Sequence, residues 1–117
     1  MKLQEFTGKL FEIETTAHIA HLQAKSFSKH IALNELYTGI VDLRDRFIES
    51  YQGKYGIIKN HIIESKPEGM EMIPYLTKIA KSFEEYEETL KEGFLKQIID
   101  DINELLYSTI YKLTNLP

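Results

Sequence analysis

The chain contains no cysteine among its 117 residues, and this absence removes three kinds of site. A disulfide framework, a thiolate zinc site and a cysteine nucleophile are all excluded, and the composition agrees with a reducing cytoplasm. Proline and glycine are also scarce, at three and six residues. That scarcity argues against a disordered chain and against a turn-rich all-β fold. The composition, with 43% apolar and 27% charged residues, is typical of a packed globular domain.

A long apolar run and a basic cluster are missing as well. No segment approaches the roughly 18 consecutive apolar residues of a membrane span, and the N-terminal segment, which carries Glu5, does not resemble a signal peptide. The formal charge is −4, and no lysine- or arginine-rich cluster is present to neutralise phosphates. We therefore expect a single cytoplasmic domain over residues 1–117 that neither enters a membrane nor binds DNA.

Apolar residues recur every three or four positions in four stretches, and this spacing predicts amphipathic helices. The expected helices lie at about 3–23, at about 27–52, from near Pro74 onward, and after Gly93. Ser26 is the expected N-cap of the second helix, and Gly53 and Gly56 are expected to end it. A short helix near 57–64 is predicted in the segment that follows. The pattern predicts an all-α, up-down four-helix bundle with a crossover segment between the second and third helices.

The second helix carries two distinct faces. Its core face is expected to consist of Leu33, Leu36, Ile40, Leu43 and Phe47. Because each residue turns the helix by about 100°, a separate polar set points away from that stripe, namely His30, Asn34, Asp45 and Glu49. Tyr37, Val41 and Ile48 make this second face partly apolar. A helix that is apolar on two sides usually has a partner on both, so the second face predicts another subunit.

The polar set is spaced symmetrically along the helix. His30 and Asp45 are about 22 Å apart along the axis, at about 1.5 Å per residue, so they cannot hold the same ion within one chain. The position halfway between His30 and Glu49 is nevertheless the same as the position halfway between Asn34 and Asp45. Two copies of this helix, antiparallel about a two-fold axis, would bring each histidine against the other chain's carboxylates. The spacing therefore predicts a two-fold dimer with two identical sites.

His18 is the expected additional ligand, because an antiparallel hairpin would lay the end of the first helix beside the start of the second. His21 lies three residues later and is an alternative. The predicted cluster joins His18, His30 and Asn34 of one chain to Asp45 and Glu49 of the other. Imidazole and carboxylate ligands without sulfur suit iron, with manganese or zinc as substitutes.

The intervals between these residues resemble those of the Dps proteins, the mini-ferritins of the ferritin-like superfamily. That family has a histidine on its first helix, a second one twelve residues later, an aspartate four residues after that, and an Asp-x-x-x-Glu pair eleven residues further on. The same intervals join His18, His30, Asn34, Asp45 and Glu49 in this chain. Phe27 and the run Glu35–Tyr37 flank the second histidine as they do in that family.

The resemblance implies a ferritin-like bundle whose metal sites are shared between two-fold-related subunits. It implies an iron-binding ferroxidase that oxidises Fe(II), usually with hydrogen peroxide, and stores ferric iron inside a shell of twelve subunits. Asn34 stands where the family has a carboxylate, so the second iron position is expected to be weak or missing. The chain lacks the lysine-rich tail through which many members bind DNA, and it is shorter than typical members.

Two other interpretations remain open. The bundle could be a non-catalytic structural or partner-binding module, because single helical histidines are usually surface or interface residues. Alternatively, acidic residues on the third and fourth helices could hold magnesium, as in all-α nucleotide pyrophosphohydrolases. These residues are Glu84, Glu87, Glu88, Asp100, Asp101 and Glu104. A solvated acidic face is the simpler interpretation of that group.

Overall fold

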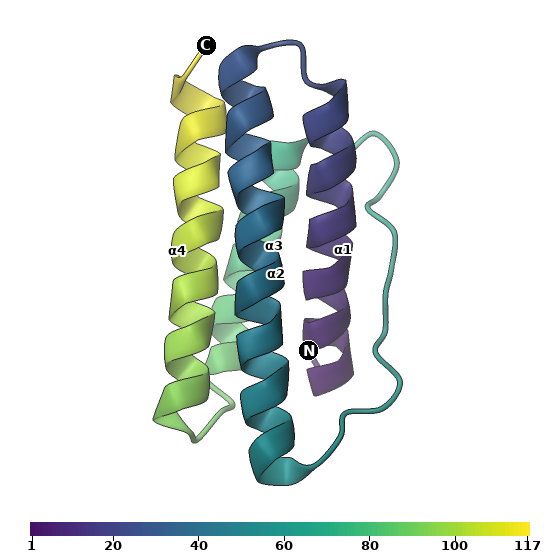
Figure 1. The fold of residues 1–117 in the computed structure, drawn as a ribbon, viewed down its shortest axis with the longest axis vertical. Coiled ribbons are helices and arrows are strands. Elements are labelled where there is room, and N and C mark those ends of the chain that lie inside the picture. Colours follow the sequence, from purple (N-terminus) through teal and green to yellow (C-terminus); the bar gives the residue numbers. More distant parts are fainter.

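The computed structural model describes residues 1–117 and contains four helices and no strand. The helices are α1 (Leu3–Gln23), α2 (Phe27–Tyr55), α3 (Met72–Glu87) and α4 (Gly93–Asn115). They lie side by side in a body of 43 × 24 × 21 Å, with α1 and α4 running one way and α2 and α3 the other (Figure 1). The prediction of an all-α fold with four helices is confirmed. None of these helices combines the length and apolarity that a membrane span requires.

The ends of α1 and α2 follow from local sequence. α1 occupies the predicted residues, 3–23. Ser26 caps α2, because its hydroxyl accepts a hydrogen bond from the backbone N–H of Lys29 at 3.3 Å. The expectation that Gly53 ends α2 is wrong, since the helix continues to Tyr55. Gly56 follows with a φ of 99°, a backbone conformation that glycine adopts without steric cost, and the helix stops there.

The four helices enclose one apolar core of 21 buried residues. The ring of Phe6 lies at its centre, edge-on to Phe47 and Phe83 with centroids 4.7 and 4.8 Å away, and stacked on Tyr86 at 4.7 Å. The predicted core face of α2 is confirmed, with four residues buried and Leu43 partly buried against the cluster. The buried four are Leu33, Leu36, Ile40 and Phe47. The polar face of α2 therefore points away from the core.

A glycine in the middle of α2 lets α4 approach closely. A Cβ atom on Gly39 would lie 2.9 Å from Cδ2 of Leu105 on α4, which is shorter than an ordinary contact. α2 packs against α1 on one side and against α4 on the other, while α3 packs on α4. Gly39 therefore has a packing role between α2 and α4, although glycine is unfavourable in a helix interior.

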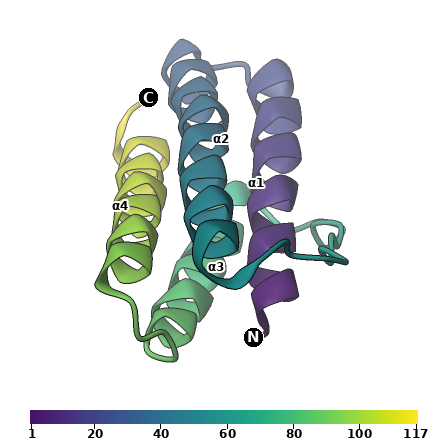
Figure 2. The same ribbon diagram turned by 60° about the horizontal axis from the view of Figure 1, so that its bottom comes forward.

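Residues 56–71 connect α2 to α3 by passing along the outside of α1 (Figures 1 and 2). The predicted helix near 57–64 is absent, because contacts with α1 take up the groups that a local helix would use. The backbone N–H of Ile62 donates to the carbonyl of Gln4 at 3.0 Å. The side chain of His61 meets the Thr7 hydroxyl, with Nδ1 and Oγ1 2.7 Å apart. Tertiary contacts thus override the local helical preference of this segment.

Gly8 on α1 provides the space for this crossover. A Cβ atom at Gly8 would lie 1.6 Å from the carbonyl oxygen of Ile62, a distance that no packed structure tolerates. The crossover backbone therefore touches the α1 backbone directly at this point. The glycine is buried inside a helix, and close approach is its evident role.

Glu92 closes the end of the bundle where α2 stops and α4 begins. This residue directly precedes α4, and its carboxylate accepts hydrogen bonds from the Tyr55 hydroxyl and from the Lys54 ammonium group, the latter at 3.1 Å. The hydrogen bond from Tyr55 is the main reason why the pKa of Glu92 is lowered to about 2. The carboxylate therefore stays ionised, and it ties the end of α2 to the start of α4.

Replacing Gly8 with alanine should displace the crossover from α1 and lower the free energy of unfolding by about 1–3 kcal/mol, the usual cost of overpacking. Urea denaturation followed by circular dichroism measures this loss. Gly53→Ala is the matched control, because a Cβ atom added there would have no other atom within 4 Å. That variant should gain about 0.5–1 kcal/mol from the better helix propensity of alanine. Equal effects of the two substitutions would contradict the close approach at Gly8.

Candidate functional site

The turn between α1 and α2 brings two histidines into reciprocal contact. α1 ends at Gln23 and α2 begins at Phe27, so the last turn of α1 lies beside the first turn of α2. Nδ1 of His21 donates a hydrogen bond to the His30 carbonyl at 2.6 Å, and Nδ1 of His30 donates to the His21 carbonyl at 2.9 Å. The two imidazole rings stack with centroids 3.7 Å apart. Each histidine thus holds the backbone of the other helix.

This reciprocal contact sets the tautomer of both rings. A carbonyl oxygen only accepts hydrogen bonds, so each Nδ1 carries a hydrogen and each neutral ring keeps its lone pair on Nε2. The hydrogen bonds of His21 and His30 leave Nε2 without a partner in the chain. Metal-binding histidines usually donate the other ring N–H to a carbonyl or carboxylate, which orients the ring and raises its basicity. His30 therefore has the tautomer and the support that a metal ligand needs.

His18 and Asn34 join the same cluster through Tyr37. The ring of His18 stacks on the ring of Tyr37, with centroids 4.1 Å apart and planes 12° from parallel. The Tyr37 hydroxyl donates a hydrogen bond to Oδ1 of Asn34 at 2.9 Å. His18 is exposed, whereas His21 is buried with 8% of its surface accessible. Exposure therefore favours His18 over His21 as the ligand from α1.

The two predicted carboxylates lie elsewhere on α2. Asp45 is 15 residues from His30 and Glu49 is 19, which places them about 22 and 28 Å further along the axis. Both are exposed, and Glu49 has no ion pair. Within one chain, no group of three histidine, aspartate or glutamate side chains is placed to hold a metal ion. The structure thus links His18, His30 and Asn34 indirectly, through His21 and Tyr37, and keeps Asp45 and Glu49 apart from them.

Arg44 was not among the predicted site residues, yet it contacts one of them. Its Nε lies 3.1 Å from Oδ1 of Asp45, and its Nη1 forms an ion pair with Glu14 of α1. The guanidinium carbon lies 4.2 Å from the centre of the Phe11 ring, a cation–π geometry. The sequence does hold a signal for this residue, because Arg44 occupies a position of the core stripe, four residues after Ile40. A charge placed there needs partners where it emerges from the core.

The acidic residues on α3 and α4 form separate pairs. Partial burial, reinforced by a hydrogen bond with Asp100, raises the pKa of Glu87 to about 7. Glu84 instead accepts a hydrogen bond from Tyr107 at 2.6 Å, and Asp101 pairs with Arg46 at 3.4 Å. Two of the six predicted magnesium-binding carboxylates, Glu84 and Asp101, therefore have other partners, whereas Glu87 and Asp100 pair with each other.

Comparison with known proteins places the chain in a family without assigning an activity. The family described as "Family of unknown function (DUF5856)" matches residues 21–113, and the chain belongs to this family. The chain is also similar to an "Uncharacterized 14.6 kDa protein in mobD-ri intergenic region" of Enterobacteria phage T4. The two are 28% identical over 116 residues, which cover 97% of this chain and 88% of the phage protein. No solved structure matches the chain significantly.

Replacing His21 with phenylalanine should keep an aromatic ring in the stack but remove the hydrogen bond to the His30 carbonyl. We expect the free energy of unfolding to fall by about 1 kcal/mol, the net contribution of one such bond. Urea denaturation checks this value, with His18→Phe as the control. Because the ring of His18 is exposed, this control should lower the free energy of unfolding by less than about 0.5 kcal/mol. A loss at His18 as large as the loss at His21 would contradict the role of the reciprocal contact.

Proposed function

We propose that this member of the DUF5856 family is a Dps-like iron-binding protein that oxidises Fe(II) at two sites shared by a two-fold dimer. In each site, His30 and His18 of one subunit face Glu49 and Asp45 of the other. The ion that these sites bind and oxidise is cytoplasmic Fe(II), and manganese or zinc are its substitutes. Storage of the ferric product requires a closed shell such as a dodecamer, since a dimer alone encloses nothing.

The order of the helices supports a ferritin-like bundle. α2 and α3 run in the same direction and are joined by the long segment 56–71 outside α1 (Figure 1). Ferritin-like folds differ from simple up-down bundles in having one such crossover, and they build metal sites from side chains on facing helices. The arrangement therefore agrees with the resemblance that the spacing of the histidines and carboxylates suggested.

The observation that carries the proposal is the orientation of His30. Its Nδ1–H is engaged by the carbonyl of His21 at 2.9 Å, so the basic Nε2 is left for an ion. The Asn34 amide lies one turn further on the same face, with its oxygen held by the Tyr37 hydroxyl. This chain thus contributes nitrogen donors at one end of α2 and carboxylates at the other. Neither half of the set is a metal site without the other.

The exposed face of α2 suits a second, antiparallel copy of the same helix. The pairing that sets His30 against Glu49 also sets Ile31 against Ile48, so an apolar contact lies beside each polar one. Ile31 is 38% exposed, and this pairing would cover it. Thr38 and Val41 meet at the centre of this pairing, and both are small. Reciprocity of this kind is the property of a two-fold interface.

The chemistry follows from the donor set. Glu49 and the imidazoles hold the ferrous ion, and the carboxylates stabilise the extra charge of the ferric product. Hydrogen peroxide accepts two electrons and two protons to give two water molecules. It therefore oxidises two ferrous ions, one electron from each. The two sites of the dimer lie about 20 Å apart along the helices, so each site must supply both electrons, from two ferrous ions that bind there together or in succession.

One observation favours the second candidate, a non-catalytic bundle that acts as a structural or partner-binding module. Asp45 already has a cationic partner, because the buried Arg44 lies 3.1 Å from its Oδ1. A metal ion would have to compete with that guanidinium group for the carboxylate. Glu49 has no such partner, and the iron proposal therefore depends more on Glu49 than on Asp45.

Anaerobic titration with Fe(II), followed by hydrogen peroxide, tests the proposal. The wild type should bind about one ion per chain and then develop ferric absorbance. His30→Ala and Glu49→Gln should each weaken binding at least tenfold, because a ligand is lost. Glu85→Gln is the control, since this exposed carboxylate lies on α3, away from the polar face of α2, and should leave binding unchanged. The variants His18→Ala and His21→Ala identify the ligand from α1.

Two results would decide against iron. Absence of tight metal binding in the wild type would leave the non-catalytic module. Binding that survives both His30→Ala and Glu49→Gln would place the metal elsewhere in the molecule.

A further inference from the structure

We propose that a cavity between α1, α3 and the crossover binds a phosphate group, either as free phosphate or as a phosphomonoester. The cavity has a volume of about 240 Å³ and is separate from the histidine cluster. Its polar lining comes from three elements, with Lys9 on α1, Lys78 on α3 and Ser65 on the crossover. Each of these side chains can donate hydrogen bonds.

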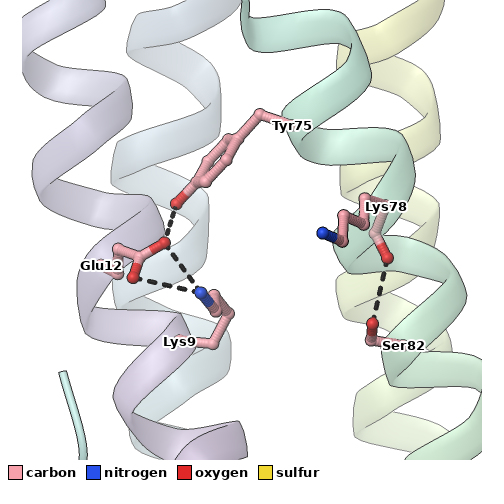
Figure 3. A network of polar contacts seen from close by, with 5 residues as sticks. All are labelled: Lys9, Glu12, Tyr75, Lys78 and Ser82. Carbon is pink, nitrogen blue, oxygen red and sulfur yellow. Dashed lines mark hydrogen bonds and ion pairs between the residues drawn. The ribbon is translucent and has the colours of Figure 1, made fainter. Parts of the chain in front are cut away.

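A buried network holds Lys9 in place. Its Nζ lies 3.1 and 3.0 Å from the two carboxylate oxygens of Glu12, and the Tyr75 hydroxyl donates to the same carboxylate (Figure 3). Glu12 is 3% exposed, so its charge needs both of these partners. Burial raises the pKa of Tyr75, and the hydroxyl stays a neutral donor. Lys9 is therefore anchored, and its ammonium group can direct a remaining hydrogen into the cavity.

Lys78 faces the same space from the opposite wall. Its side chain extends from α3 toward α1, and its ammonium group points into the gap that Lys9 borders (Figure 3). Lys78 forms no ion pair, and the hydroxyl of Ser65 has no hydrogen-bond partner. The hydroxyl of Ser82 is occupied, because it donates to the Lys78 carbonyl at 3.2 Å. Glu12 already compensates the charge of Lys9, so Lys78 is the ammonium group of this cavity that has no anionic partner.

The arrangement of donors fits a tetrahedral oxyanion. Two ammonium groups and a hydroxyl approach from three separate elements, so each can bind a different phosphate oxygen. The remaining wall includes Pro67, Met70 and Ile79, which could contact the organic part of a monoester. Glu64 also lines the cavity and has no ion pair. Its carboxylate competes with phosphate for the two lysines, so its removal should strengthen binding.

Calorimetric titration of the intact chain at constant ionic strength tests this inference, with inorganic phosphate and phenyl phosphate as probes and chloride as the reference. Phosphate or its ester should bind saturably. Lys78→Gln should weaken that binding about tenfold or more, because a charged donor is lost. Lys81→Gln is the matched control, since this exposed lysine on α3 does not line the cavity. Glu64→Gln should tighten binding several-fold.

The outcomes separate clearly. Tighter binding of phenyl phosphate assigns the cavity to a phosphomonoester, and tighter binding of phosphate assigns it to the free ion. No saturable binding beyond that of chloride overturns the inference, and so does an equal loss in Lys78→Gln and Lys81→Gln. Both lysines are exposed, so neither substitution should disturb folding.

Discussion

The reciprocal hydrogen bonds between His21 and His30 are the constraint on which the candidate site depends. The last carbonyls of a helix have no intrahelical partner, and His30 satisfies one of them at the end of α1. The same contact fixes which nitrogen of each ring is free, and it sets the spacing of α1 and α2 beside Tyr37. The stack of Tyr37 on His18 then orients a second imidazole. The His21–His30 pair thus joins α1 to α2 and also determines which ring nitrogen can bind a metal ion.

Near the C-terminal end of α2, an arginine already pairs with one of the predicted metal ligands. Arg44 is buried, and it divides its guanidinium group between Glu14 and Asp45. A buried arginine that lost both partners would leave an uncompensated charge, which is strongly destabilising. The pair therefore serves stability whether or not a metal binds. A cation at Asp45 can be accommodated because Glu14 would still neutralise Arg44.

The sequence was sufficient where local rules decide the structure. Helical periodicity placed α1 and the buried face of α2, and Ser26 identified the start of α2. The prediction of a helix near 57–64 was wrong, because the contacts of Ile62 and His61 with α1 cannot be inferred from the sequence of that segment. The roles of Gly8 and Gly39 depend on residues far away in the chain.

The candidate site divides in the same way. Rotation around one helix correctly set four polar residues on the face away from the core, because that is a property of α2 alone. The partner of Arg44 on α1 and the hydrogen bond between Tyr37 and Asn34 required side-chain positions. Whether His30 meets Glu49 is a property of two chains, and it stays a prediction.

The antiparallel pairing of two α2 helices is the central claim, and a distance between spin labels tests it most directly. The chain has no native cysteine, so Phe27→Cys, at a position 79% exposed, accepts a single label. Antiparallel helices paired around the centre of the polar set place the two labels about 40 Å apart, at about 1.5 Å per residue. The account predicts that distance in pulsed electron resonance. Labels close together, or no dipolar coupling between them, would contradict it.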